Sequence, residues 1–92
     1  MKGKIRRNLA LKELDIKENP DGSARVFSIV FVTQSGNRVF LPRAVSTGLR
    51  HNMSIHRHRG ILPVDSQGNK NGHVYPVNID LIIELNSKEI VL

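Results

Sequence analysis

Residues 24–33 are the most hydrophobic stretch of the chain, and as a β-strand this stretch is apolar on both faces. One face carries Phe27, Ile29 and Phe31, and the other carries Val26, Val30 and Val32 with Ser28 among them. A strand with two apolar faces has to be covered on both sides. We therefore expect it in the middle of a sandwich or closed barrel, or beneath a second copy of the chain.

Strong turn signals lie on either side of this stretch. Asn-Pro-Asp-Gly at 19–22 precedes it, and Ser-Gly-Asn at 35–37 follows it. Residues 38–41 then alternate as a returning antiparallel strand, which Pro42 is expected to end. The pattern predicts a β-hairpin here. It also favours Phe40 as a core residue, together with Phe27 and Phe31.

The segment before the first turn is ambiguous. Leu9 and Leu11 alternate in one phase, and Leu14 and Ile16 alternate in the opposite phase. A strand therefore needs a bulge near residues 12–13. A helix starting near Asn8 places the same apolar residues on roughly one side. The strand is favoured, and the helix remains open.

The last third of the chain is more regular. Residues 61–64 are predicted to be a short strand, which Pro63 places at a sheet edge, and residues 65–72 are turn-forming. Odd-numbered positions from 75 to 85 are apolar, which indicates one long amphipathic strand with Glu84 facing water. A four-residue loop at 86–89 is preferred, because a two-residue loop would place Glu84 opposite Glu89.

These segments define the expected fold class. The 92 residues include nine Ile and nine Val but no cysteine, so β-branched side chains favour strands and no disulfide is possible. We expect one all-β domain over residues 1–92, a small OB-like or SH3-like barrel or sandwich. It would have about six mostly antiparallel strands and one long basic connection at 43–59.

Charge is unevenly distributed along the chain. The formal net charge is +6, and residues 22–63 carry six arginines, three histidines, no lysine and no acidic residue. A local positive field attracts polyanions, and the forked guanidinium group fits phosphate. A basic N-terminal arm at 1–7 and the 43–59 loop are the predicted contacts with nucleic acid. The candidate residues are Lys2, Lys4, Arg6, Arg7, Arg43, Arg50, His56, Arg57, His58 and Arg59.

Other chemistries are less well supported. His51, His56 and His58 have imidazoles for a metal, but adjacent arginines repel cations and no carboxylate lies near them in sequence. No nucleophile–base spacing is present, so catalysis, a metal and a cofactor are not expected. Exposed aromatic platforms for bases are also scarce, and only Tyr75 is a candidate.

The sequence therefore favours a cytoplasmic, non-enzymatic, nucleic-acid-binding protein that contacts mainly the phosphate backbone. The apolar segment after the basic N-terminus is interrupted at Lys12 and Glu13, so neither a secretory signal nor a membrane contact is expected. DNA and RNA are not distinguished, nor are single and double strands. The alternative is a self-assembling structural or adaptor protein, such as a phage or mobile-element component. In that case the basic middle meets acidic surfaces, and residues 90–92 offer an edge strand.

Overall fold

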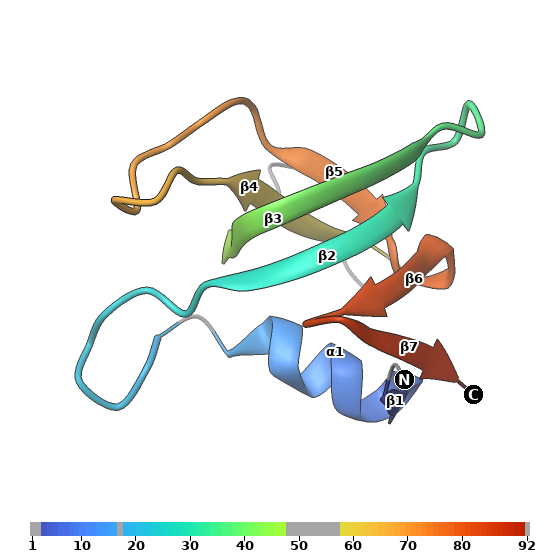
Figure 1. Ribbon diagram of the computed structural model, residues 1–92, viewed down its shortest axis with the longest axis horizontal. Helices are drawn as coiled ribbons and strands as arrows, with labels where there is room; N and C mark the ends of the chain where they lie inside the picture. The colour runs from blue at the N-terminus through green and yellow to red at the C-terminus, as the bar shows by residue number, and fades with distance from the viewer. Residues whose placement is uncertain (1–2, 17, 48–57, 92) are drawn as a thin grey trace.

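The computed structural model describes residues 3–16, 18–47 and 58–91, which form a mixed seven-stranded sheet and one helix (Figure 1). The elements in chain order are β1 (Lys4–Arg6), α1 (Arg7–Asp15), β2 (Phe27–Val32), β3 (Arg38–Thr47), β4 (His58–Pro63), β5 (Tyr75–Asn78), the 3₁₀ turn η1 (Ile79–Leu81), β6 (Ile82–Leu85) and β7 (Lys88–Val91). The sheet order is β1-β7-β6-β2-β3-β4-β5, and only β1 and β7 pair in parallel. The all-β prediction is confirmed, with seven strands instead of six.

The short connection between β5 and β6 forces the sheet to curl. Four strand spacings separate the two strands in the sheet order, which is about 19 Å across a flat sheet. The chain from Asn78 to Ile82 spans at most about 14 Å even when fully extended. The sheet therefore bends back on itself, as Figure 1 shows. It stays open between its edges β1 and β5, so the predicted closed barrel is wrong.

The inner face of the curled sheet forms the core. Its buried residues come from five strands and the helix, namely Ala10, Leu14, Phe27, Ile29, Phe31, Leu41, Ala44, Ile61, Val77, Ile82 and Leu85. Helix α1 lies beside β1 and β7 at one side of the sheet (Figure 1). Because the sheet does not close, part of its apolar interior is covered by the helix instead of by another strand.

The favoured strand at residues 9–17 is wrong, since residues 7–15 form α1. Ala10 and Leu14, one helical turn apart, are buried, whereas Leu9 and Ile16 are exposed. The Ser46 hydroxyl donates a hydrogen bond to the Leu14 carbonyl, which attaches the end of the helix to β3. The local sequence pattern is ambiguous. The packing of Ala10 and Leu14 against the sheet therefore determines that this segment is a helix and not a strand.

The β2–β3 hairpin is confirmed, and β3 is longer than expected. The strand continues through Pro42 to Thr47, so residues 43–47 and 58–59 of the predicted loop belong to β3 and β4. The register between β2 and β3 shifts where Phe27 pairs with Ala44 and Ile29 with Leu41. This irregularity accommodates Pro42, because a residue without a backbone N–H is tolerated at a bulge.

Two predictions about the following strands are wrong. Strand β4 lies between β3 and β5 and is not an edge. Pro63 is tolerated because β5 pairs only with residues 58–61. The expected long strand at 75–85 is divided by η1, where the Asn78 side chain accepts a hydrogen bond from the Asp80 amide at 2.9 Å. That capping bond turns the chain from the outer edge of the sheet to its centre.

The turn between β6 and β7 has two residues and not four, so Glu84 does lie opposite Glu89. Asn86 and Ser87 have φ values of 51° and 63°. Two consecutive positive φ values are the geometry of a type I′ turn, which matches the twist of the strands on either side. Glu84 is 8% exposed, not water-facing, and Arg38 Nη2 lies 3.5 Å from its Oε2. The favourable geometry of the type I′ turn and the contact of Glu84 with Arg38 outweigh the repulsion between Glu84 and Glu89.

Replacing Ser87 with Gly is expected to raise the free energy of unfolding by about 0.5–1 kcal/mol, because Gly adopts the left-handed conformation without steric cost. Urea denaturation measures the change. Ser66→Gly is the control, since Ser66 lies in a turn without a positive φ and should lose a little stability. A Ser87→Gly variant no more stable than the parent would contradict this account of the turn.

The termini differ from expectation. Residues 4–6 of the predicted arm form β1, which pairs with β7 through Ile5 and Ile90. The predicted C-terminal edge at 90–92 is therefore covered, in its described residues, by β1. Within the described part of the chain, no helix is long and apolar enough to cross a membrane.

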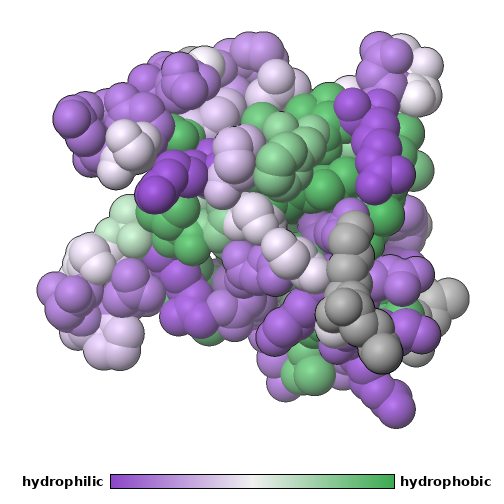
Figure 2. Space-filling view, in the orientation of Figure 1, coloured by the Kyte–Doolittle hydropathy of each residue, from purple (hydrophilic) through white to green (hydrophobic). Residues whose placement is uncertain are grey.

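The outer face of the sheet has a cross-strand row that the register defines. Phe40, Val30, Glu84, Glu89 and Lys4 lie side by side on β3, β2, β6, β7 and β1. Phe40 is 62% exposed, so its predicted place in the core is wrong. Figure 2 shows an apolar area over the β2–β3 hairpin, bordered by hydrophilic side chains.

Candidate nucleic-acid interface and seam pocket

Six of the ten predicted contact residues lie in the described part of the chain. They are Lys4, Arg6, Arg7, Arg43, His58 and Arg59. Lys2, Arg50, His56 and Arg57 lie outside the described residues, as does His51 of the possible metal site. The structure distributes the six over β1, α1, β3 and β4, so they do not form one cluster.

Two of the six are bound within the fold. Arg7, the first residue of α1, forms an ion pair with Asp80 of η1. Arg59 on β4 donates from Nε to the Asp15 carboxylate at 2.8 Å, at the end of α1. Both arginines thus attach the helix to the sheet. Arg25 does the same on the other side, donating from Nε to Glu13 at 2.9 Å.

Lys4, Arg6 and Arg43 are exposed and have no ion pair among the described residues. Lys4 and Arg6 alternate with the half-buried Ile5, so both point away from the core. Arg43 follows Pro42 at the irregularity of β3 and is exposed, whereas the next residue, Ala44, is fully buried. All three cations therefore lie on the outer side of the sheet.

Charges balance closely inside the described fold. It contains all eight acidic residues and ten of the fourteen basic ones, for a net charge of +2. The remaining +4 belongs to Lys2, Lys17, Arg50 and Arg57. Four carboxylates already face arginines, namely Glu13, Asp15, Asp80 and Glu84. The other four carboxylates, Glu18, Asp21, Asp65 and Glu89, have no ion pair among the described residues, and the chain as a whole keeps its net charge of +6.

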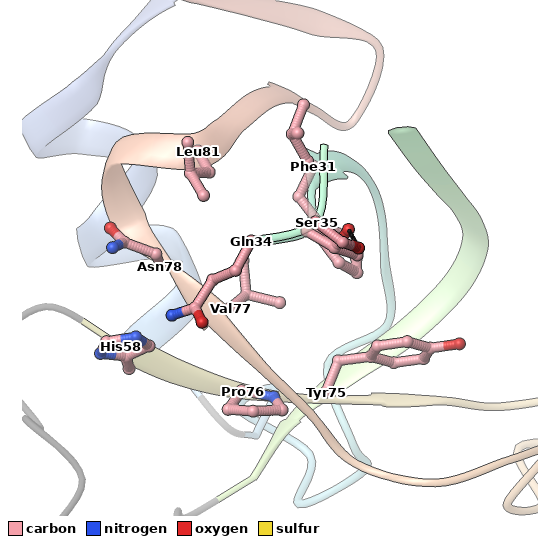
Figure 3. Close-up of a pocket in the computed structure, with 11 residues that line it drawn as sticks. Phe31, Gln34, Ser35, His58, Tyr75, Pro76, Val77, Asn78 and Leu81 are labelled. Carbon is pink, nitrogen blue, oxygen red and sulfur yellow. Dashed lines mark hydrogen bonds between the residues drawn. The ribbon is translucent and has the colours of Figure 1, made fainter. Parts of the chain in front are cut away.

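A pocket of about 430 Å³ lies where the open sheet comes back on itself, between β5 and the end of β2. We call it the seam pocket. Its lining is Phe31, Val32, Thr33, Gln34, Ser35, His58, Tyr75, Pro76, Val77, Asn78 and Leu81. In Figure 3 the Gln34 and Asn78 amides and the His58 ring lie toward one side of the pocket, and Tyr75 lies at the other. Within the ranges that the structure describes, no Asp, Glu, Lys or Arg lines it.

The polar groups of the seam pocket have defined hydrogen-bonding capacity. Asn78 uses its Oδ1 to accept from the Asp80 amide, so its Nδ2 donor remains for another partner. The Nδ1 atom of His58 is buried and has no hydrogen-bond partner in the described structure. Gln34 is exposed in the β2–β3 turn, and its amide has no hydrogen bond to any residue that the structure describes. The pocket can therefore form hydrogen bonds with the polar edge of an uncharged ligand.

Tyr75 has a fixed orientation at this pocket. Its ring centroid lies 5.5 Å from that of Phe31 with an interplanar angle of 64°, an edge-to-face contact. The His73 ring lies 4.5 Å away on a tilt of 38°. The expectation that Tyr75 is the only candidate aromatic platform is wrong, because Phe40 is 62% exposed and Tyr75 is half-buried.

Sequence reasoning missed Gln34 and Asn78 as candidate functional residues. The signal for Asn78 is local, since an Asn side chain commonly accepts a hydrogen bond from the backbone N–H two residues on. No local signal marks Gln34, because the pocket exists only once β5 reaches the end of β2. Among the described residues, no group of three or more His, Cys, Asp or Glu side chains is placed to hold a metal ion.

The fold and its surface thus define an open, strongly curled β-sheet domain with both exposed cations and glutamates on its outer side. Its seam pocket has no Asp, Glu, Lys or Arg among the described lining residues. Comparison of the chain with protein-family models, with curated proteins and with solved structures finds no match.

Proposed function

We propose that this protein is a cytoplasmic nucleic-acid-binding domain without catalytic activity, which contacts mainly the phosphate backbone. The observation that carries the proposal is the distribution of charge. The acidic residues lie within the described fold and several face arginines there, whereas Lys4, Arg6 and Arg43 are exposed without an ion pair. The forked guanidinium groups of Arg6 and Arg43 can each bind a phosphate with two donors at once.

The region around Arg6 and Arg7 supports the proposal further. These residues line a shallow, open depression of about 430 Å³ together with Asn8 and Leu11. A backbone phosphate can approach Arg6 there without entering the core. The sequence adds Arg50 and Arg57 between β3 and β4, with no acidic residue near them along the chain.

The test is binding of labelled single- and double-stranded DNA and RNA over a series of salt concentrations. We expect affinity to fall steeply with salt. A plot of the logarithm of the binding constant against the logarithm of the salt concentration should steepen by about 0.7–0.9 for each phosphate neutralised. The variant Lys4→Ala/Arg6→Ala/Arg43→Ala is expected to reduce the slope by about 2. Arg50→Ala/Arg57→Ala is expected to reduce it by about 1–2.

A second triple variant controls for net charge. Lys12→Ala/Lys70→Ala/Lys88→Ala removes three exposed lysines that have no ion pair in the described structure, and should change the slope by less than about 1. Equal effects of the two triple variants would show that binding depends on total charge and not on these residues. Absence of binding by the parent at low salt would overturn the proposal.

The exposed outer face favours one second candidate, a self-assembling protein. Phe40 is 62% exposed on the outer row, and Figure 2 shows an apolar area over the same β2–β3 hairpin. Contiguous exposed apolar patches are typical of protein contacts. Light scattering on the same samples distinguishes the candidates. A defined oligomer that Phe40→Asp converts to monomer, in a protein that binds no nucleic acid at low salt, would favour assembly.

A further inference from the structure

We propose that the seam pocket receives one unstacked nucleobase of a single-stranded nucleic acid whose phosphates contact the exposed cations. This inference rests on the proposed function and adds a base-binding site to it. The pocket volume of about 430 Å³ is within the size range of small-ligand sites. The pocket is also distinct from the cationic residues that carry the proposed phosphate contacts.

The side chains that line the seam pocket favour an uncharged ligand. Among the described residues, no Asp, Glu, Lys or Arg lines the pocket, so a phosphate, a carboxylate or an ammonium group would lose its hydration there without gaining an opposite charge from them. Apolar contacts come from Phe31, Val77 and Leu81, and polar contacts from the amides and the imidazole (Figure 3). A nucleobase has both properties, with flat apolar faces and a polar edge.

The hydrogen-bonding groups are suited to the edge of a base. The Oδ1 atom of Asn78 already accepts a hydrogen bond from the Asp80 amide. The side chain can therefore contribute a donor, Nδ2, to a base. The Gln34 amide offers one donor group and one acceptor on a turn that can adjust. The Nδ1 of His58 has no partner among the described residues, but it is itself buried, so it is not counted among the groups that reach a base in the pocket.

The seam pocket also lies next to a predicted phosphate contact. Leu81 of the pocket follows Asp80, and Asp80 pairs with Arg7 at the start of α1. Arg6 precedes Arg7 in the chain and is exposed. A single strand can place a base in the pocket while an adjacent phosphate reaches Arg6. Duplex DNA cannot do so without breaking a base pair, so single strands should bind better.

The test compares a short labelled single strand with a matched strand in which abasic sites replace the nucleosides. Thymidine and adenosine versions are both used, and affinity is measured by fluorescence anisotropy. The parent protein is expected to bind the strand with bases at least about fivefold more tightly than the abasic strand, the effect of stacking one base. Emission from Tyr75, the only tyrosine in a chain without tryptophan, should change only with the strand that has bases.

Two variants with matched controls localise the effect. Gln34→Ala is expected to weaken binding of the strand with bases about threefold to tenfold, the value of one hydrogen bond, and to leave abasic binding unchanged. Gln67→Ala, in the exposed 65–72 loop, should alter neither. Asn78→Asp keeps the acceptor for the Asp80 amide but removes the donor. Its charge control is Asn71→Asp in the same distant loop, at the other end of the β4–β5 hairpin.

The outcomes separate the two proposals. Salt-dependent binding that is equal for the two strands would overturn the base pocket and leave phosphate binding standing. Absence of binding to either strand would overturn both. A third outcome is base-dependent binding that Gln34→Ala and Asn78→Asp weaken no more than their controls Gln67→Ala and Asn71→Asp. The base would then bind elsewhere, and the assignment to this pocket would be overturned. Thermal unfolding of each variant confirms that its fold is intact.

Discussion

Replacing Leu14 with Ala is expected to lower the free energy of unfolding by about 3 kcal/mol. Leu14 is 1% exposed and is one of the largest fully buried side chains. It packs into the core from α1, on the side that the open sheet leaves uncovered. Truncating a buried leucine removes its transfer free energy and leaves a cavity, at a cost of about 2–5 kcal/mol.

Leu9→Ala is the matched control on the same helix. Leu9 is 49% exposed, and Ala has the higher helix propensity, so the change should be within about 0.5 kcal/mol. Urea denaturation of both variants gives the comparison. If the two substitutions had the same effect, α1 would not pack through the face that contains Ala10 and Leu14.

The second large effect is expected at Phe31. Phe31 is 2% exposed at the end of β2 that leads into the hairpin, and it packs edge-to-face on Tyr75. Phe31→Ala should lower the free energy of unfolding by about 4 kcal/mol, of which the aromatic pair accounts for about 1 kcal/mol. Because Phe31 also lines the seam pocket, nucleic-acid binding by this variant would not be a clean test of the pocket.

Phe40→Ala, on the paired strand, is the control for Phe31→Ala. Phe40 lies on the opposite face of the hairpin and is 62% exposed, so its truncation should cost about 1 kcal/mol or less. Calorimetric melting of the two variants tests the assignment of inner and outer faces. A larger loss for Phe40→Ala would mean that a second copy of the chain covers the outer face.

Local patterns predicted the parts of the fold that local interactions stabilise. The turn at 19–22 forms as expected, with the Gly22 amide donating to the Asn19 carbonyl at 2.9 Å. Next to it, the Ser23 hydroxyl and amide lower the pKa of the exposed Asp21 carboxyl by hydrogen bonding. The β2–β3 hairpin is similar, because alternation and turn residues lie within one short segment.

Predictions that depended on long-range packing were less successful. The apolar residues of 9–16 fit a strand or a helix almost equally, and only the docking of Ala10 and Leu14 on the sheet distinguishes the two. Phe40 was assigned to the core because alternation shows which residues share a face but not which face is buried. The turn at 86–87 was rejected on pairwise repulsion, without knowledge that Arg38 would face Glu84.

The candidate site divides in the same way. The sequence predicted Lys4, Arg6 and Arg43 as contact residues, and the structure places all three on the surface, while their role stays a prediction. It could not show that Arg7 and Arg59 bind Asp80 and Asp15, which are far away in the chain. The seam pocket was not predictable either, because Gln34 and Asn78 meet only through the curl of the sheet.

The sequence by itself determined an all-β chain with a well-defined hairpin and a positive middle, because β-branched residues, turn residues and charges act within a few positions along the chain. Only the tertiary structure decided that the sheet stays open, that a helix covers part of its core and that a neutral pocket forms at the seam. The physical reason is the three-residue turn η1, which joins an edge strand to a central one. Its capping hydrogen bond is local, but the curl that it imposes is a property of the whole sheet.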